Sequence, residues 1–245
     1  MSTSGDHKAA FRLGTSGYQY NHWRGVVYPE GQPKRKWFEL YTEEFNSVEI
    51  NNTFYNLPKA ETFDVWREAA PEGFLFALKY SQYGTHMKRL KDPASHVGVF
   101  MEPAERLGAK LGPILVQLPP NFKANAERLD AFLEAVPDDQ RWSLEFRDED
   151  WYRDEVYDVL RRHNAALCLH DMMPGLPEMV TADWVYLRYH AAQHEGDYPH
   201  QALSASAERI KQWLNDGLDV YAYFNNDVGG HAVHNARDLR RYVTE

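Results

Sequence analysis

The chain has 245 residues, of which 43% are hydrophobic and 26% charged, the composition of a soluble globular protein with a substantial core. Its single cysteine, Cys168, excludes an intramolecular disulfide and a cysteine-rich metal cluster, and its formal net charge of −9 disfavours non-specific binding to nucleic acid. Residues 1–11 lack the apolar stretch of a signal peptide and no run approaches a membrane span, so we expect a cytoplasmic location and no membrane partner.

Eight short segments rich in β-forming residues recur along the chain, and most of them end in turn or polar residues. These predicted strands are residues 12–18, 47–55, 74–81, 113–120, 141–148, 165–171, 184–190 and 219–227. Between them the apolar residues recur at i, i+3, i+4 and i+7, which is typical of amphipathic helices. The predicted helices are residues 35–45, 60–70, 125–136, 153–163, 205–217 and 235–243, with Gly217 as a C-cap.

The alternation of strands and helices predicts an α/β fold, a single-domain (β/α)8 TIM barrel over residues 11–245 after a flexible N-terminus of residues 1–10. The segment 172–182 holds two prolines and at most a short helix, so we expect an irregular unit between strands six and seven. A doubly wound open sheet is the alternative, but no G-x-G-x-x-G spacing follows the first strand.

In a (β/α)8 barrel the active site lies at the carboxyl ends of the strands, and period-two alternation assigns each strand residue to a face. The polar residues that alternation directs toward the barrel axis or its rim are Glu49, Asn51, Thr53, Lys79, Ser81, Gln117, Glu145, Arg147, His170, Asp171, Tyr186, Arg188, His190, Tyr223, Asn225, Asn226 and Asp227. Buried charges are costly unless they are paired or serve a ligand. The set is therefore a structural salt-bridge network or a site, and its convergence at one end favours a site.

Two interpretations use the acidic residues. Glu49 and Glu145 have the residue types of a glycosidase pair, unless they only pair with Lys79 and Arg147. Glu49, Glu145, His170 and Asp171 could instead bind a divalent metal. No H-x-H, H-E-x-x-H or D-x-D motif supports that site, so we expect no cofactor and find a metal only weakly supported.

Two further interpretations use the cations. Lys79 could form a Schiff base if its neighbours depress its pKa, although an ion pair with Glu49 on the adjacent strand is the more common role of such a lysine. Alternatively, Lys79, Arg147 and Arg188 could clamp an anionic group, since the guanidinium fork matches carboxylates and phosphates. These cations outnumber the two inward glutamates. An anionic ligand is the simplest way to balance the excess positive charge.

Loops after the predicted strands carry weaker signals. Residues 85–92 place His86 and several cations beside the presumed mouth, where a solvated basic helix is an equal alternative. Trp23 and Trp151 lie in loops after strands one and five, where they stack on a sugar ring or base, or merely cap the barrel. Residues 224–236 run through a Gly-Gly turn into the last helix, a place where barrels often bind phosphate.

Several motifs resemble those of the YecE-like family, also called domain of unknown function 72. They are GTSGYQYNHWRGVVYP, VEINNTFYNLP, FALKYSQYGTHMKRL, GPILVQLPPNF, LEFRDEDWY, LRYH and YFNNDVGGHAVHNA, in order from about residue 12 to residue 243. The resemblance implies a TIM barrel often described as related to sugar isomerases. Two departures, Ala191 after the strand-seven histidine and YPHQALSAS before the next helix, indicate a differently shaped loop.

The matched motifs cover most of the inward residues. They include Gly14, Ser16, Trp23, Glu49, Asn51, Thr53, Phe54, Tyr55, Lys79, Thr85, His86, Gln117, Pro119, Glu145, Arg147, Trp151, Asp171, Arg188, His190, Asn225, Asn226 and Asn235. We expect an enzyme that acts on a small polar or anionic molecule, a sugar acid or sugar phosphate, by isomerisation or lyase-type proton transfer.

In this hypothesis Glu49 or Glu145 is the general base, Lys79 is its partner or the acid, and His170 is a second candidate acid. The residues expected to bind the substrate are Ser16, Tyr18, Trp23, Asn51, Thr53, Tyr55, His86, Gln117, Arg147, Trp151, Asp171, Arg188, His190, Tyr223, Asn225 and Asn226. Two alternatives stay open. One is a nucleic-acid end or abasic-site binder, or a nuclease resembling endonuclease IV-type barrels, which the net charge disfavours; the other is a non-catalytic ligand-binding barrel.

Overall fold

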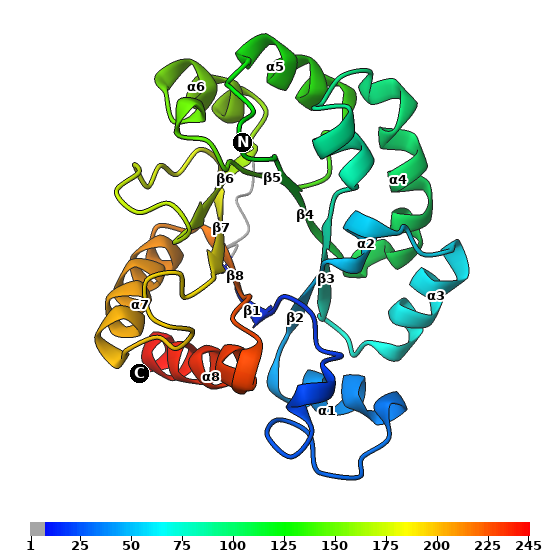
Figure 1. Cartoon of the computed structure of the whole chain (residues 1–245), viewed down its shortest axis with the longest axis vertical. Coiled ribbons are helices and arrows are strands. Elements are labelled where there is room, and N and C mark those ends of the chain that lie inside the picture. Colours follow the sequence, from blue (N-terminus) through cyan, green and yellow to red (C-terminus); the bar gives the residue numbers. More distant parts are fainter. Residues whose placement is uncertain (1–7) are drawn as a thin grey trace, which may run out of the picture.

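Eight parallel strands surrounded by helices make up the computed structural model, which describes residues 8–245 (Figure 1). The strands are β1 (Phe11–Thr15), β2 (Ser47–Ile50), β3 (Leu75–Lys79), β4 (Leu111–Gln117), β5 (Trp142–Glu145), β6 (Ala166–His170), β7 (Trp184–Tyr189) and β8 (Asp219–Phe224). Their order in the sheet is β1-β8-β7-β6-β5-β4-β3-β2, so that β1 and β2 are the two strands that must meet to close a barrel. The predicted (β/α)8 fold is confirmed. The flexible N-terminus expected over residues 1–10 falls mostly on residues 1–7, outside the described residues.

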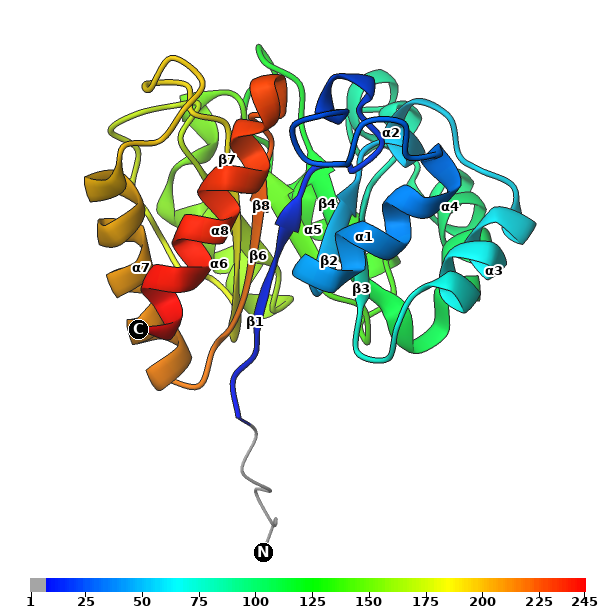
Figure 2. The ribbon, with the colours of Figure 1, turned by 90° about the horizontal axis from the view of Figure 1, so that it is seen from below.

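Helices cover the outside of the barrel (Figures 1 and 2). They are α1 (Trp37–Glu44), α3 (Ala60–Ala69), α4 (Val97–Ala104), α5 (Ala126–Ala135), α6 (Asp154–Arg162), α7 (His200–Asn215) and α8 (His231–Thr244), whereas the short α2 (Asn52–Tyr55) follows the carboxyl end of β2 and lies at the mouth. Within residues 8–245 no helix lies between β6 and β7, as the two prolines predicted. Gly217 has φ +84° just beyond α7 and is the expected C-cap. Across the described chain, none of the helices is both long and apolar enough to cross a membrane.

The interior consists of two packed layers. Outside the strands, aromatic rings from helices stack on strand residues, as Trp66 of α3 does on Phe76 of β3 with ring centroids 5.9 Å apart. Inside the lower barrel, Trp184, Tyr186 and Tyr221 fill the lumen with other small and apolar side chains. The lumen is therefore a packed core at its amino end, which leaves the carboxyl end for polar groups.

Strand β2 is shorter than predicted. It ends at Ile50 because Asn51 turns into the right-handed helical region (φ −83°, ψ −19°) and begins α2. The Thr53 hydroxyl donates to the carbonyls of Ile50 and Lys79, at 3.0 and 2.7 Å, and holds this turn on the barrel. The prediction that residues 47–55 form one strand, with Asn51 and Thr53 on the lumen face, is therefore wrong beyond residue 50.

The barrel closes between β1 and β2 partly through side chains. The Tyr41 hydroxyl of α1 accepts from the Thr15 amide at 2.8 Å and donates to the Ser47 carbonyl at 3.0 Å. Nearer the carboxyl end, Ser16 and Glu49 form a parallel bridge. This closure places the Glu49 side chain against β1 at the floor of the barrel mouth.

Candidate active site at the carboxyl end of the barrel

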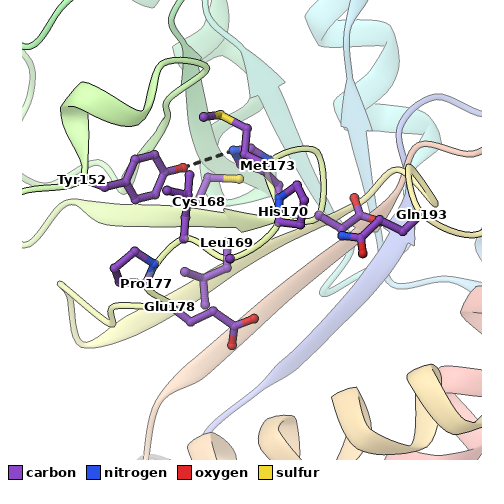
Figure 3. Close-up of a pocket in the computed structure, with 12 residues that line it drawn as sticks. Tyr152, Cys168, Leu169, His170, Met173, Pro177, Glu178 and Gln193 are labelled. Atoms are coloured by element: carbon purple, nitrogen blue, oxygen red, sulfur yellow. Dashed lines mark hydrogen bonds between the residues drawn. The ribbon is translucent and has the colours of Figure 1, made fainter.

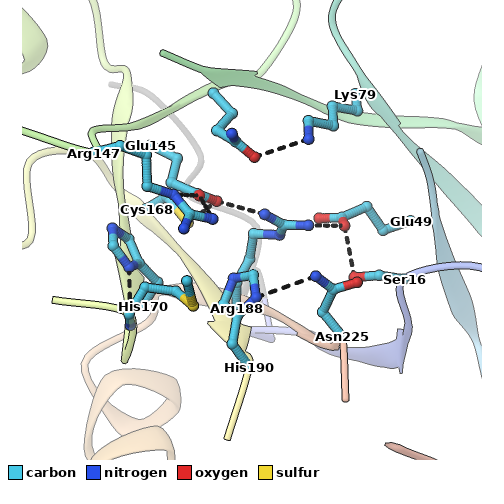
Figure 4. A network of polar contacts seen from close by, with 12 residues as sticks. Ser16, Glu49, Lys79, Glu145, Arg147, Cys168, His170, Arg188, His190 and Asn225 are labelled. Carbon is cyan, nitrogen blue, oxygen red and sulfur yellow. Dashed lines mark hydrogen bonds and ion pairs between the residues drawn. The ribbon is translucent and has the colours of Figure 1, made fainter. Parts of the chain in front are cut away.

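An arginine lies between two glutamates at the centre of the lumen (Figure 4). Arg188 of β7 donates through Nη2 to Glu49 Oε1 at 2.7 Å and through Nη1 to Glu145 Oε2 at 2.6 Å. The two glutamate residues are 0% exposed and Arg188 is 2% exposed. Three strands thus contribute one fully desolvated ionic cluster, which confirms that alternation had directed these side chains inward.

The oxygens of both glutamates are occupied by neighbours. Ser16 Oγ donates to Glu49 Oε1 at 2.6 Å, and the Tyr186 hydroxyl donates to Glu49 Oε2 at 2.7 Å. Arg147 donates through Nε to Glu145 Oε1 at 2.5 Å. Burial alone would raise the pKa of Glu145, but the charges of Arg188 and Arg147 hold it well below its usual range.

Lys79 of β3 lies apart from this cluster (Figure 4). Its Nζ donates to Gln117 Oε1 of β4 at 2.8 Å and lies 4.3 Å from the centre of the Phe54 ring. No carboxylate among the described residues forms an ion pair with it, so the expected pairing with Glu49 is not observed. Burial, together with the positive charge of Arg188, lowers the pKa of Lys79 to about 8.

The level of the residues in the barrel explains why Lys79 and Glu49 do not pair. In the β2–β3 register Glu49 lies opposite Ala77, one inward position below Lys79. Glu49 is therefore in the layer that Arg188 reaches, whereas Lys79 projects from the layer above, toward the mouth. Adjacent strands alone do not make two inward residues neighbours.

His190 stands at the end of β7, beside Asn225 of the loop after β8. The Asn225 amide donates to His190 Nδ1 at 3.1 Å, which places the ring hydrogen on Nε2. Burial and the charge of Arg188 lower the pKa of His190 to about 4, so the imidazole is neutral at physiological pH. His190 Nε2 and Arg188 Nε are both buried without a hydrogen-bond partner among the described residues.

His170 and Asp171 lie at the end of β6 with their polar atoms engaged. His170 Nε2 contacts the Phe146 carbonyl at 3.0 Å and the Tyr152 hydroxyl at 3.3 Å, and Nδ1 accepts from the Met172 amide at 3.3 Å. Asp171 accepts from the His190 amide at 2.9 Å and from the Tyr198 hydroxyl. Both residues thus hold the loops of the mouth in place.

A cavity of about 280 Å³ lies beside β6, where the barrel lacks an outer helix (Figure 3). Tyr152 and His170 line it on one side, and Pro177 and Glu178 of the segment after β6 line it on the other. It includes neither Lys79 nor the arginines of the cluster. The cavity lies where the unit between β6 and β7 is irregular, and it adjoins the ionic cluster through Cys168, whose thiol contacts Glu145 Oε2 at 3.8 Å.

Several residues that the sequence suggested as substrate contacts lie outside the mouth. Trp23 and Trp151 are 0% exposed; the first donates through Nε1 to the Asp227 carbonyl and the second stacks on Phe146. Their ring faces are not available to a ligand, which favours the alternative in which they cap the barrel. Tyr18 is buried against Tyr41 of α1.

Other expected contacts have structural partners of their own. The Tyr223 hydroxyl lies 2.6 Å from Ser47 Oγ, deep in the lumen. Asn226 donates to the Gly196 carbonyl at 2.9 Å and thereby ties the β7–α7 loop. Tyr55 is 72% exposed, and the His86 ring packs edge-on against Phe54 at 5.0 Å. Asn51, where β2 ends, keeps a buried Oδ1 without a partner among the described residues.

Two residues that contact the charged groups were not among those expected to bind the substrate or to take part in catalysis. Tyr186 was assigned to the lumen by alternation, and its position two residues before Arg188 was the signal that it would reach the same carboxylate. Phe54 lies within residues 47–55, which were predicted to form one strand, and was not expected to contact Lys79. Only the turn at Asn51 places Phe54 beneath the Lys79 amine.

The proposed metal ligands do not form a ligand set. Among residues 8–245 no group of three or more histidine, cysteine, aspartate or glutamate side chains is arranged to hold a metal ion. Glu49 and Glu145 are occupied by arginines, and Asp171 by Tyr198 and the His190 amide.

A parallel eight-stranded barrel with a polar carboxyl end defines the chain as a TIM-barrel protein. The family model described as "Protein of unknown function DUF72" matches residues 12–245, and the chain belongs to this family. The resemblance found in the sequence motifs is thereby confirmed.

Relatives of known sequence and structure agree with this assignment. The UPF0759 protein YecE of Escherichia coli K12 is 32% identical over 110 residues, which span 44% of this chain and 40% of that protein. The UPF0759 protein YunF of Bacillus subtilis is 23% identical over 87% of this chain and 88% of its own length. The crystal structure of a DUF72 family protein from Thermotoga maritima superposes with a TM-score of 0.81 at 27% identity, covering 96% of this chain and 100% of that one. A DUF72 family protein from Enterococcus faecalis gives 0.77 at 21% identity over 98% and 99%, and supports the fold.

Proposed function

We propose that this protein is an enzyme that binds a small anionic, sugar-like molecule at the carboxyl mouth of the barrel and transfers a proton on it, as an isomerase or a lyase. The observation that carries the proposal is the state of Lys79. It is a buried amine with a neutral hydrogen-bond partner, directly above a cluster in which both carboxylates are already used by arginines.

The charges around the mouth support an anionic ligand. Lys79, Arg147 and Arg188 face only two carboxylates, those of Glu49 and Glu145, so one positive charge lacks a counterion within the group. Buried charge of one sign is costly unless a ligand balances it. Arg188 Nε and His190 Nε2 are also buried donors without a partner among the described residues, and an oxygen-rich group such as a carboxylate or phosphate would satisfy them.

The geometry changes the roles that the sequence suggested. Glu49 and Glu145 have their oxygens occupied, and the low pKa of Glu145 makes it a weak base and an unsuitable acid. In the proposed mechanism they hold Arg188, while Lys79 exchanges the proton because its pKa of about 8 lies near physiological pH. Neutral His190 then donates from Nε2 to a substrate oxygen.

Thermal-shift measurements test the proposal most directly. We expect sugar acids or sugar phosphates to raise the melting temperature of the wild-type protein, and Lys79→Met to abolish the shift. Lys211→Met is the matched control, because Lys211 lies near the carboxyl end of α7, at the end of the barrel opposite the mouth, and pairs with Glu208 of the same helix at 3.2 Å. Stabilisation by DNA with an abasic site, without any response to small anions, would contradict the proposal and favour the nucleic-acid alternative.

A further inference from the structure

We infer that Lys79 forms a protonated imine with its substrate, and that the substrate is therefore an anionic molecule carrying an aldehyde or ketone. The inference rests on the proposed function, because it uses the same mouth and the same anionic ligand. It replaces the acid–base role of Lys79 with a covalent one, so the two can be tested separately. From the sequence, an ion pair with Glu49 is a more common role for Lys79 than a Schiff base. The structure shows no such ion pair, so this objection to the Schiff base does not apply.

The contacts of the amine favour a nucleophile over a structural cation. A lysine that serves an ion pair is held by a carboxylate, whereas Lys79 donates one hydrogen bond to the neutral amide oxygen of Gln117. The Phe54 ring covers another side of the amine at 4.3 Å, and the residue is 8% exposed. The ring face and the amide oxygen can each contact an ammonium, but neither carries a charge that would neutralise it, so burial makes the uncharged amine more accessible than it is for an ion-paired lysine.

Electrostatics act in the same direction. Arg188 and Arg147 repel the ammonium, and the resulting pKa of about 8 leaves a useful fraction of the amine unprotonated at neutral pH. At pH 7 that fraction is about one in ten, compared with about one in several thousand for an unperturbed lysine. The same arginines attract the anionic group of the substrate, so they serve both binding and activation.

Exposed lysines of the chain have the opposite surroundings. Lys88 and Lys123 are ion-paired to Asp92 and Asp148, each at 3.1 Å, and these hydrogen-bonded carboxylates raise the pKa of both amines. They are therefore internal controls for the reactivity of Lys79 in one and the same sample.

The step balances without any further reagent. The Lys79 ammonium releases a proton to solvent, and the neutral nitrogen attacks the carbonyl carbon; the nitrogen then loses a second proton and the carbonyl oxygen takes one up, which gives a neutral carbinolamine. The carbinolamine then loses its hydroxyl group as water, with the proton that water needs supplied by solvent. The overall change joins one ammonium and one carbonyl compound into one protonated imine and one water, with no oxidation or reduction. The positive nitrogen withdraws electrons from the neighbouring carbon, which eases proton transfer there.

Reductive trapping tests the inference on the wild-type protein. The probe is glyceraldehyde 3-phosphate with cyanoborohydride at pH 7, followed by mass spectrometry of the intact protein and of its peptides. We expect one reduced adduct on Lys79, formed at least about tenfold faster than adducts on Lys88 or Lys123, since the unprotonated fraction differs by more than that. Adducts spread over exposed lysines while Lys79 stays unmodified would overturn the inference.

Variants and a matched ligand separate this inference from the proposed function. Lys79→Met should remove the dominant adduct, whereas Lys88→Met should keep it. Glycerol 3-phosphate has the phosphate but no carbonyl. If it stabilises the wild-type protein but not Lys79→Met, and glyceraldehyde 3-phosphate leaves no adduct on Lys79, the anion-binding function stands and the covalent role is wrong. If Lys79→Met does not fold, the peptide map of the wild-type protein decides alone.

Discussion

Arg188 holds Glu49 and Glu145 at nearly equal distances, 2.7 and 2.6 Å, and thereby joins β2, β7 and β5 at the centre of the barrel. A buried ionic triad of this kind contributes little net stability, because desolvation offsets most of the attraction. Its effect is geometric: the guanidinium is fixed in one orientation, with its Nε left for another partner. Together with Arg147, which pairs with Glu145, the cluster is neutral, and it is better understood as a rigid floor for the mouth than as a source of folding energy.

Replacing the central arginine should be severely destabilising. In Arg188→Met two carboxylates stay buried after losing their shared partner, and such a loss typically costs about 3–5 kcal/mol. Urea denaturation at pH 7 measures the change. Arg161→Met is the control, because its pair with Asp158 has side chains 45% and 64% exposed and should cost less than about 1 kcal/mol.

The loss in the free energy of unfolding caused by Arg188→Met should be smaller at acidic pH. In the wild-type protein the folded pKa of Glu145 is depressed below 4.5, so its contribution is present above that pH and is lost as pH falls through the folded pKa. In the variant, burial without Arg188 raises the carboxyl pKa values, and protonation then relieves the strain. Equal deficits at pH 7 and pH 4 would show that packing, and not charge, causes the loss.

Lys79→Met should stabilise the protein at pH 7 while abolishing ligand binding. The folded pKa of about 8 lies below the ordinary 10.5, so below pH 8 both states are protonated and the fold bears the full cost of a buried ammonium. Removing the amine relieves a cost of at most about 3 kcal/mol, and losing the hydrogen bond to Gln117 takes back about 1 kcal/mol. The free energy of unfolding of Lys79→Met should therefore rise by about 2 kcal/mol.

The pH dependence identifies the cause of this gain. As pH rises from 8 to 10.5 the folded wild-type protein loses the Lys79 proton first and becomes more stable, so the advantage of Lys79→Met should decline over that window. Urea denaturation at pH 7, 9 and 10 measures the decline. A variant that is less stable than wild type at every pH would mean that Lys79 is a structural cation.

The direction of the inward side chains could be predicted from the sequence, but their partners could not. Alternation is a local property of each strand, and it placed Glu49, Lys79, Glu145 and Arg188 correctly in the lumen. Pairing depends on register and strand tilt, which bring residues from different strands to the same level. Arg188 thus reaches Glu49 from β7 across the lumen, while Lys79 on the neighbouring strand does not.

The ends of the strands and helices could not be predicted reliably from the sequence either. Residues 51–55 read Asn-Asn-Thr-Phe-Tyr, and only Phe54 continues the apolar face of Val48 and Ile50; the strand was extended on that one residue, although the chain becomes helical after Asn51. The helix α4 was also not predicted, because its sequence VGVFMEPA contains a glycine and a proline and shows no clear apolar stripe. Both errors arise where tertiary contacts, such as Thr53 with the Lys79 carbonyl, override local preference.

Gly14→Ala should open the seam between β1 and β2. A Cβ at this position would lie 2.0 Å from the Ser47 carbonyl oxygen and 2.7 Å from the Tyr41 hydroxyl, so the two strands would have to separate. We expect a loss of about 3 kcal/mol or more in the free energy of unfolding. Gly98→Ala is the control: this glycine of α4 has nothing within 4 Å of the added carbon, and alanine should stabilise the helix by up to about 1 kcal/mol.

His190 should stay neutral in the folded protein at pH values well below the ordinary histidine pKa. Burial and Arg188 lower its pKa from 6.5 to about 4, against the opposing charges of Glu145 and Asp171. Because the unfolded chain takes up the proton first, this residue's contribution is intact above pH 6.5 and is lost as pH falls toward 4. The loss is on the order of 2–3 kcal/mol.

His190→Gln should reduce the loss of unfolding free energy between pH 6.5 and 4. It should not abolish that loss, since burial also lowers the pKa of His86 and His170. Urea denaturation of both proteins between pH 4 and 7 measures the difference, and nitrogen chemical shifts of the ring report its protonation directly. Identical slopes in the two proteins, or an imidazolium signal at pH 5.5, would contradict a neutral His190. That result would mean that Nδ1 also carries a hydrogen and cannot accept from the Asn225 amide, so this contact would have to rearrange.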